Sequence, residues 1–324
     1  MIKTYLFTGI TSQLGQMFTK VLSRTTGTYI VGLCRKESMG RAKKIFSAYD
    51  NVILVSAEKG EKTLVKGLLS LYRPDIVGHL AARSSVFESN QAPLQYFESN
   101  VEYTLNILDS IRAVRSATYS PKFFNMSSTE IFGNSNGALI EKRNEDTPIN
   151  PSNMYGASKA AAHVYVDTYR SIYNIYANNI IAANFTSEFQ NSSFVASKII
   201  NYLLGDKKEK LNLGNTNSIR DWSYAEDMVE AILASLEPDT PSNYCAASGN
   251  INTVEEFTQM AFSKFGISDY KNYINIENKL IRIGDTNFVN IDCAKLKMLG
   301  WAPTHNTEQL INKIIKNKRV ANDS

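Results

Sequence analysis

Cysteine and histidine are scarce in this chain. Its 324 residues include 3 of each, and Cys34, Cys245 and Cys293 lie far apart. Three widely spaced cysteines argue against a disulfide scaffold, and the scattered histidines add no spacing typical of a zinc site, so no metal is predicted. No hydrophobic run is long enough to span a membrane. Because the chain starts directly with a predicted strand, we expect no signal peptide and predict a cytoplasmic location.

Charge of one sign is not in large excess either. The formal net charge is +4 and the sequence pI is about 8.7. This charge is too mild and too dispersed to predict nucleic-acid binding, although it suits an anionic small substrate. Hydrophobic residues make up 43% of the chain and charged residues 20%. This composition predicts a folded enzyme with one large domain and one smaller lobe.

Short apolar runs alternate with helical patterns through residues 1–185. The runs lie near 3–7, 29–34, 52–55, 75–80, 122–126 and 178–183. This alternation is typical of a parallel, doubly wound α/β sheet. Over 186–316 the pattern changes, which predicts a smaller C-terminal α/β substrate lobe, with some later segments returning to the sheet. Residues 317–324, at the lysine- and asparagine-rich end, are predicted to be a frayed tail.

A glycine-containing turn follows the first predicted strand and leads into a helical pattern. Strand, glycine turn and helix form the opening of a Rossmann-like dinucleotide-binding fold, in which the N–H groups at the helix start bind a pyrophosphate. A serine stands where the usual pattern has its middle glycine. The predicted cofactor-binding residues of this turn are Gly9, Thr11, Ser12, Gln13, Leu14 and Gly15.

The end of the second predicted strand lacks the acidic residue that often binds the ribose hydroxyls of NAD. It carries Arg35 and Lys36 instead, with Arg41 shortly after. Several cations here suit the 2′-phosphate of NADP, whereas a solvated basic turn would need no ligand. We therefore predict NADP as the cofactor, with NAD as the alternative.

Tyr155 and Lys159 are four residues apart in a predicted helix and so share one face. An ammonium beside a phenol favours the phenolate, so Lys159 is expected to lower the pKa of Tyr155 towards neutrality. A tyrosine of this kind is a general base that takes a proton from an alcohol. An ordinary amphipathic helix is the alternative explanation of the spacing.

Nine short sequence blocks lie in order along nearly the whole chain. They are Gly9-Ile-Thr, Leu80-Ala-Ala, Ser128-Thr-Glu-Ile-Phe-Gly133, Glu145-Asp-Thr-Pro148, Tyr155-Gly-Ala-Ser-Lys159, Phe194-Val-Ala-Ser-Lys198, Leu213-Gly-Asn215, Arg220-Asp-Trp222 and Leu299-Gly-Trp301. With these blocks the chain resembles the extended short-chain dehydrogenase/reductases. Within them it is most similar to the nucleotide-sugar 4,6-dehydratases of the GDP-mannose 4,6-dehydratase family.

The resemblance implies internal oxidation and reduction of a sugar carried on a nucleoside diphosphate. Tyr155 would take the proton of the sugar 4-hydroxyl as hydride leaves C4, with Lys159 holding the cofactor ribose and Ser128 sharing the proton transfer. Glu130 would remove the C5 proton as water leaves C6, and hydride would return to C6. Leu80 and Ala81 would contact the cofactor.

The resemblance also implies a substrate, its contacts and an assembly. A GDP-linked sugar is preferred, with mannose as the default. The implied substrate-binding residues are Ser85, Thr129 and Asn184 near the sugar, Lys198 at the base, Arg220 at the diphosphate and Asp285 at the ribose. A surface ion pair between Arg220 and Asp221 and a solvated Lys198 are the alternatives. Helices near 90–112 and 153–173 would form a homodimer, or part of a homotetramer.

Several positions depart from the family pattern. Asn184-Phe-Thr-Ser187 replaces Asn-His-Glu-Ser, Phe189-Gln-Asn191 replaces an arginine-rich segment, and Arg83 and Ser85 replace a glutamine and a histidine. These exchanges leave room for a different sugar or a changed reaction. A nucleotide-sugar C4 oxidoreductase or epimerase that does not use Glu130 is therefore the second hypothesis. A non-catalytic binding protein on the same fold is the third.

Overall fold

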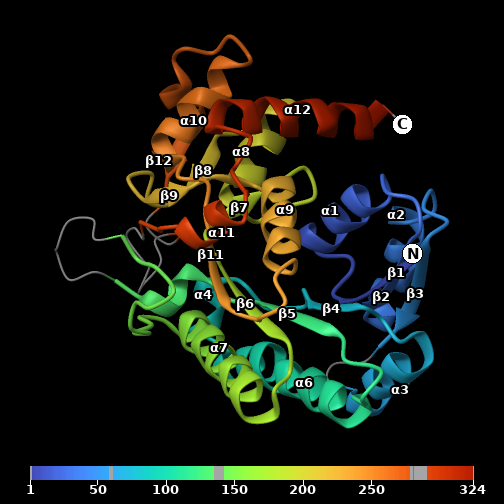
Figure 1. Ribbon diagram of the computed structural model, residues 1–324. Helices are drawn as coiled ribbons and strands as arrows, with labels where there is room; N and C mark the ends of the chain where they lie inside the picture. The colour runs from blue at the N-terminus through green and yellow to red at the C-terminus, as the bar shows by residue number, and fades with distance from the viewer. Residues whose placement is uncertain (1, 58–60, 135–141, 278–279, 281–289, 324) are drawn as a thin grey trace.

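The computed structural model describes residues 2–57, 61–134, 142–277, 280 and 290–323 (Figure 1). A parallel sheet of seven strands in the order β11-β6-β5-β4-β1-β2-β3 lies at its centre. The strands are β1 (Lys3–Thr8), β2 (Thr28–Cys34), β3 (Val52–Ser56), β4 (Ile76–His79), β5 (Lys122–Met126), β6 (Ala177–Ala182) and β11 (Asn243–Ala246). The strand order reverses between β1 and β4, which opens a crevice at their carboxyl ends.

All six predicted apolar runs are strands of this sheet, so the predicted doubly wound sheet is confirmed. The seventh strand, β11, was not located from the sequence. It has only four residues, Asn243–Ala246, and pairs with β6 at the edge of the sheet. So short a run, without clear alternation, carries little signal of its own.

Helices cover both faces of the sheet (Figure 1). One face carries α1 (Gln13–Leu22), α2 (Met39–Ile45) and α9 (Ala225–Ser235), and the other carries α3 (Lys62–Tyr72), α6 (Tyr103–Val114) and α7 (Met154–Tyr173). Neighbouring residues of β1 point to opposite faces, because successive strand side chains alternate. Phe7 belongs to the apolar cluster with α1 and α9, and Leu6 to the cluster with α3 and α6.

Shorter elements connect the helices and strands of the first half. They are η1 (Lys36–Ser38), α4 (Val86–Ser89), α5 (Pro93–Phe97), the π-helical turn η2 (Glu98–Glu102) and the 3-10 helix η3 (Thr129–Phe132). α5, η2 and α6 follow one another without a break, so the helix predicted near 90–112 is present as three consecutive pieces. The helix predicted near 153–173 is α7.

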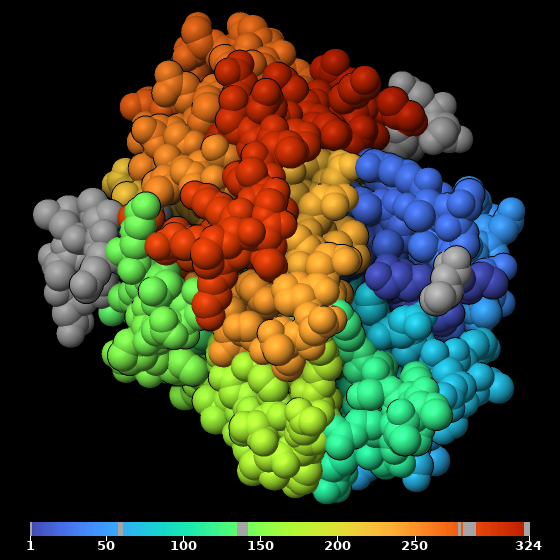
Figure 2. Space-filling view, in the orientation of Figure 1, coloured from blue at the N-terminus to red at the C-terminus, as the bar shows by residue number. Residues whose placement is uncertain are grey.

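The second half of the chain builds a smaller lobe from short elements. Its strands form three pairs, β7 (Phe185–Thr186) with β10 (Ser223–Tyr224), β9 (Ile219–Asp221) with β12 (Ile251–Thr253), and β8 (Leu211–Leu213) with β13 (Ile274–Ile276). Its helical elements are α8 (Val195–Leu204), α10 (Val254–Ser263), η4 (Tyr270–Tyr273), α11 (Ala294–Met298) and α12 (Thr307–Asp323). α9 and β11 come from this half but lie on the main sheet. Figure 2 shows the light-orange α9 segment directly beside the blue N-terminal segment.

The end of the chain differs from the predicted frayed tail, because α12 continues to Asp323. Leu310, Ile311, Ile314 and Ile315 form a buried stripe at helical spacing. The Asn317 side-chain amide donates to the Glu188 carboxylate at 2.8 Å. The segment is therefore a docked amphipathic helix, with Lys316 and Arg319 exposed on its outer face. Within the described residues, no helix combines the length and apolar character needed to cross a membrane.

Candidate active site

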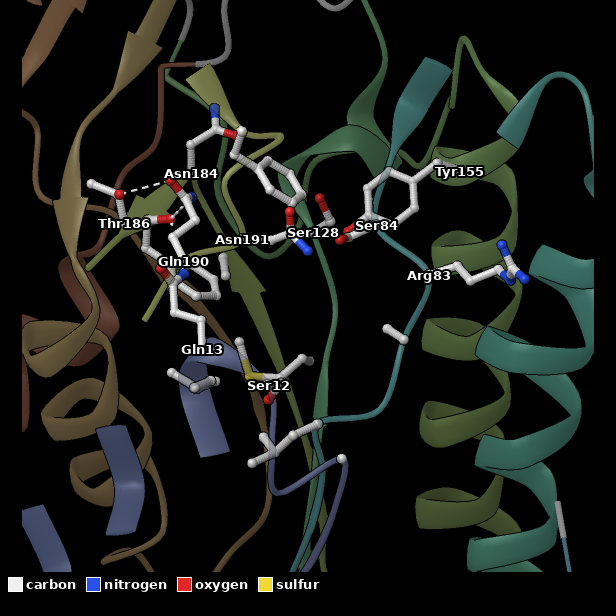
Figure 3. Close-up of a pocket in the computed structure, with 18 of the residues that line it drawn as sticks. Ser12, Gln13, Arg83, Ser84, Ser128, Tyr155, Asn184, Thr186, Gln190 and Asn191 are labelled. Atoms are coloured by element: carbon white, nitrogen blue, oxygen red, sulfur yellow. Dashed lines mark hydrogen bonds between the residues drawn. The ribbon is translucent and has the colours of Figure 1, made fainter. Parts of the chain in front are cut away.

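A cavity of about 830 Å³ lies at the carboxyl ends of β1, β2, β4, β5 and β6. Residues at or just after these strands line it from the sheet side. From the smaller lobe it is lined by Phe194, Val195, Asn215, Arg220 and Trp222. Figure 3 shows the cavity between the start of α1, the wall that includes Asn184, and Tyr155 of α7. Its volume is in the range of pockets that enclose small-molecule ligands and cofactors.

The turn after β1 has the close backbone approach that a dinucleotide needs. Gly9 has φ +68°, and a Cβ there would lie 2.6 Å from the backbone nitrogen of Ala81. A Cβ on Gly15 would lie 2.3 Å from the carbonyl oxygen of Ile10. Ser12, in the place of the middle glycine, caps α1 by accepting the Gly15 N–H at 3.1 Å. Steric crowding therefore explains why Gly9 and Gly15 are glycines. Ser12, in the place of the middle glycine, serves as a helix cap.

Most of the predicted cofactor residues line this cavity. They are Gly9, Thr11, Ser12, Gln13, Leu14, Arg35, Leu80 and Ala81. Gly15 lies behind the turn, where it lets α1 pack closely. Arg41 and Ser38 also line the cavity, whereas Lys36 does not. The exposed Arg35 guanidinium forms a 3.0 Å ion pair with Glu37.

The four predicted catalytic residues meet in the same cavity. Ser128 follows β5, Glu130 lies in η3, and Tyr155 and Lys159 lie in α7. Figure 3 shows the Tyr155 ring directed towards Ser128, with Ser84 close by. Segments that are distant in the sequence thus bring a phenol, an amine, a hydroxyl and a carboxylate together.

Asn153 holds Glu130 at the start of α7. Its side-chain amide donates to the Glu130 carboxylate at 2.8 Å, while its side-chain oxygen caps the helix by accepting the Gly156 N–H at 2.8 Å. A Cβ on Gly156 would lie 2.5 Å from the Glu130 carbonyl oxygen. The helix that carries Tyr155 and the turn that carries Glu130 are therefore joined by side chain and by close backbone packing.

The predicted lowering of the Tyr155 pKa was wrong for this structure. Desolvation raises the pKa of Tyr155, the Ser128 hydroxyl opposes this, and the Glu130 carboxylate adds to it. The Lys159 ammonium lies 6.0 Å from the centre of the Tyr155 ring and donates to the Met126 carbonyl oxygen at 2.8 Å. Burial also lowers the pKa of Lys159 to about 8. Desolvation therefore dominates, and Lys159 is not among the groups that shift the pKa of Tyr155.

A family model described as GDP-mannose 4,6 dehydratase matches residues 6–314. This chain belongs to that family. GDP-mannose 4,6 dehydratase 2 of Arabidopsis thaliana is 32% identical, with 97% of this chain and 86% of the relative covered. The Homo sapiens GDP-mannose 4,6 dehydratase is 27% identical, with 96% and 90% covered. The predicted resemblance is confirmed, and with it the predicted class of activity, a GDP-sugar 4,6-dehydratase.

Solved structures of other nucleotide-sugar enzymes share the fold. The dTDP-glucose 4,6-dehydratase of Bacillus anthracis, in complex with NAD, has a TM-score of 0.86 at 18% identity, and 99% of this chain and 98% of that chain are covered. The UDP-glucose 4-epimerase of Thermotoga maritima, with UDP-glucose, has a TM-score of 0.83 at 20% identity, with 98% and 99% covered. At these identities the similarity shows the fold of this chain alone, an α/β architecture.

Two of the predicted sugar contacts do not line the cavity. The Ser85 hydroxyl caps α4 by accepting the Glu88 N–H at 3.2 Å, and its carbonyl oxygen accepts the Tyr96 hydroxyl at 2.6 Å. Its neighbour Ser84 is in the cavity lining instead. Thr129 is buried within η3. The hydroxyls that face the cavity from these two segments are thus on the residues immediately before the predicted ones.

Of the described residues predicted to bind the nucleotide, one lines the cavity and one does not. Arg220 lines the cavity, next to the buried Asp221. Lys198 does not line it, and its ammonium donates to the Asn212 carbonyl oxygen at 2.5 Å. Asp285 lies outside the described residues. Of the predicted set for base, diphosphate and ribose, the structure brings only Arg220 to the described lining.

The wall opposite Tyr155 contains residues that the sequence prediction did not assign. Besides the predicted Asn184, it includes Phe185, Thr186, Phe189, Gln190 and Asn191. The Thr186 hydroxyl donates to the Gln190 side-chain oxygen at 2.9 Å (Figure 3). These residues follow the carboxyl end of β6, which is where ligands bind in doubly wound sheets. That position was the signal that could have identified them.

Proposed function

We propose that this family member converts a GDP-linked hexose, with GDP-mannose as the default substrate, into its 4-keto-6-deoxy form. The observation that carries the proposal is Glu130, held by Asn153 in the cavity that also contains Tyr155 and Lys159. Oxidation at C4 alone needs a base and a hydroxyl, whereas loss of water from C5 and C6 also needs a group that moves a proton at those carbons. We propose Glu130 as the carboxylate that performs this step.

We propose NADP as the cofactor that stays bound through the cycle. The Gly9 turn would hold the pyrophosphate, because it leads into the start of α1, which borders the cavity and carries free N–H groups. Arg35 and Arg41, at the end of β2, would hold the 2′-phosphate, which an NAD-bound solved relative would not require. When bound, NADP would accept a hydride from C4 and return it to C6.

Proton transfers fall to the chain's own side chains. Tyr155 would take the proton of the 4-hydroxyl, with the Ser128 hydroxyl bonded to the phenol. The 4-ketone acidifies C5, from which Glu130 would remove the proton, and Glu130 would pass a proton to the hydroxyl leaving C6 as water. The carboxylate is then ionised again. When the hydride returns to C6, C5 regains one proton, and this balances the proton that Tyr155 took from the 4-hydroxyl.

Arg220 is proposed to contact the diphosphate, because its planar guanidinium matches two phosphate oxygens and it lies at the lobe side of the cavity. The wall formed by Asn184, Thr186, Gln190 and Asn191 carries neutral polar groups that would face the sugar hydroxyls. A neutral hexose suits this wall better than an acidic sugar.

Enzymes of soluble nucleotide sugars work where these are made, so we keep the proposed cytoplasmic location.

A homodimer through α5 and α7 is part of this proposal, with a tetramer as its extension. Leu94 and Phe97 of α5 and Val164 and Ile172 of α7 have exposed fractions of 76%, 52%, 51% and 66%. Large apolar side chains gathered on adjacent helices are typical of an interface. Sedimentation of the wild type and of Ile172→Glu tests this: a shift of the variant to monomer is expected, and an unchanged sedimentation coefficient would remove the proposed surface.

The test of the reaction uses GDP-mannose, NADP and deuterated water. Loss of one water molecule and solvent deuterium at C5 are expected for the wild type. Glu130→Gln should stop the loss of water but leave one turnover of C4 oxidation, visible as reduced cofactor. Glu88→Gln is the matched control, because Glu88 is the other carboxylate in the described lining. Reduced cofactor or a change of stereochemistry without water loss in the wild type would favour the oxidoreductase or epimerase.

A further inference from the structure

The side chain of Gln13 joins the phosphate-binding turn to the opposite wall of the cavity. Gln13 is the first residue of α1 and lines the cavity. Its amide nitrogen donates to the Phe185 carbonyl oxygen at 3.2 Å, and its amide oxygen accepts the Ser187 hydroxyl at 3.0 Å. Both ends of one amide are thus used by a segment more than 170 residues away in the sequence.

The segment that Gln13 contacts is bonded within itself. The Gln190 side-chain amide donates to the same Phe185 carbonyl oxygen at 3.2 Å, and the Thr186 hydroxyl donates to Gln190 at 2.9 Å. The Ser187 hydroxyl accepts the Phe189 N–H at 3.2 Å. These hydrogen bonds connect Phe185, Thr186, Ser187, Phe189 and Gln190, so the two residues that Gln13 contacts are tied to side chains that line the cavity.

The same segment extends to the lobe side of the cavity. β7 pairs with β10, and the Ser223 N–H donates to the Asn184 carbonyl oxygen at 3.2 Å. Trp222, which lines the cavity, immediately precedes β10, and Arg220, which also lines it, lies in the preceding strand β9. A displacement of the segment would therefore reach the residues on both the sugar side and the diphosphate side.

We propose that Gln13 couples cofactor binding to nucleotide-sugar binding, which rests on the function proposed above. A pyrophosphate on the N–H groups of the turn holds the start of α1, and Gln13 then holds residues 185–190 in place for the sugar. The entropy of ordering this wall is lost once, when the first ligand binds, so the second ligand binds more tightly. Gln13 is in this sense a positioning residue for the sugar.

Binding titrations test the coupling in a Tyr155→Phe background, which binds without turnover. The Kd of GDP-mannose is measured by calorimetry with and without saturating NADP. A tightening of about fivefold or more by NADP is expected, with the same factor on the Kd of NADP when GDP-mannose is present, because coupling is reciprocal. Equal Kd values with and without NADP would overturn the proposal.

Ser187→Ala removes one of the two hydrogen bonds of Gln13 without touching either ligand, since Ser187 is fully buried and outside the cavity lining. The coupling factor should fall, while each single Kd changes less. Gln13→Met removes both hydrogen bonds and should bring the factor towards one, and the double variant should show no further loss beyond that of Gln13→Met. Full coupling in Ser187→Ala, with a normal thermal melt, would refute the role of Gln13.

Lys20→Gln is the matched control. It cuts a second polar tie between α1 and the same segment, the 2.7 Å ion pair of Lys20 with Glu188, and Lys20 is not in the cavity lining. Coupling should persist in this variant. Equal loss in Lys20→Gln and Ser187→Ala would mean general loosening and would overturn the proposal. If GDP-mannose binds under no condition, the proposed function itself is wrong, which is a distinct result.

Discussion

The two walls of the cavity are built on different principles. The cofactor wall consists of backbone, at the Gly9 turn and at the start of α1. One added methyl group on Gly9 would collide with the backbone of Ala81 in the same chain. The opposite wall is lined by Asn184 and by residues that depart from the family pattern, namely Phe185, Thr186, Phe189, Gln190 and Asn191. A backbone site tolerates few exchanges, whereas a side-chain wall can change its chemistry while its fold persists.

The largest effect is expected where the backbone wall is broken. Gly9→Ala places a Cβ 2.6 Å from the Ala81 nitrogen at φ +68°, so the turn must shift. We expect NADP affinity to fall by about 100-fold, in line with the free energy of strained backbone. Gly40→Ala is the matched control, because nothing lies within 4 Å of its Cβ position. Calorimetric Kd values that are equal in the two variants would contradict the comparison.

Lys159 lines the cavity, and the pH dependence of stability tests whether its amine is buried there. Its pKa is lowered by burial from 10.5 to about 8, so between about pH 8 and 10.5 the unfolded chain binds the proton and the folded chain does not. The free energy of unfolding should therefore rise with pH across this window, by about 3 kcal/mol more than in Lys159→Met. Urea unfolding of both proteins at several pH values measures this difference. Parallel curves would mean that the ammonium is not desolvated.

Substitutions of Asn153 can separate its role as the cap of α7 from its role in holding Glu130. Asn153→Ser keeps a side-chain acceptor for the Gly156 N–H but loses the amide that donates to Glu130. We expect kcat for water loss to fall about tenfold, as one charge-assisted hydrogen bond is lost, with little change in stability. Asn153→Ala should cost about 1 kcal/mol of stability in addition. A normal kcat in Asn153→Ser would show that Glu130 needs no support from α7.

The arginines at the end of β2 test whether side chains on the cofactor wall select the cofactor. Arg41→Ala should reduce the preference for NADP over NAD about fivefold, because one cation near the 2′-phosphate is lost. Lys43→Ala is the control, since Lys43 lies two residues further on and is not in the cavity lining. The ratio of the two Kd values is the measurement. Equal ratios in wild type and Arg41→Ala would leave the basic segment as a solvated turn.

The smallest effect is expected on the side-chain wall. Thr186→Val removes one neutral hydrogen bond, from the Thr186 hydroxyl to Gln190. The KM for the nucleotide sugar should rise about threefold while kcat and the Kd of NADP stay unchanged. Steady-state kinetics with GDP-mannose measure this. A large loss of affinity for NADP alone would show instead that this hydrogen bond supports the cofactor wall as well.

The sequence alone determined six strands of the main sheet, the glycine turn after β1 and the proposed catalytic side chains that meet in the cavity. Six strands, the glycines of the turn, and the residues Tyr155, Lys159, Ser128 and Glu130 could be predicted because each depends on local pattern or on the family resemblance. β11 could not, since four residues at a sheet edge carry little pattern. Ser84 rather than Ser85 lines the cavity, because the Ser85 hydroxyl is used as the N-cap of α4.

Only the tertiary structure decided the electrostatics and the connections of the site. The spacing of Tyr155 and Lys159 predicted a lowered pKa for the phenol, but burial in the folded chain raises it. The contacts of Gln13 with Phe185 and Ser187, and the docking of α12, likewise require distant segments to meet. Local patterns record which residues can form a turn, a helix or a strand. Burial and long-range hydrogen bonds arise only when the folded chain brings these elements together.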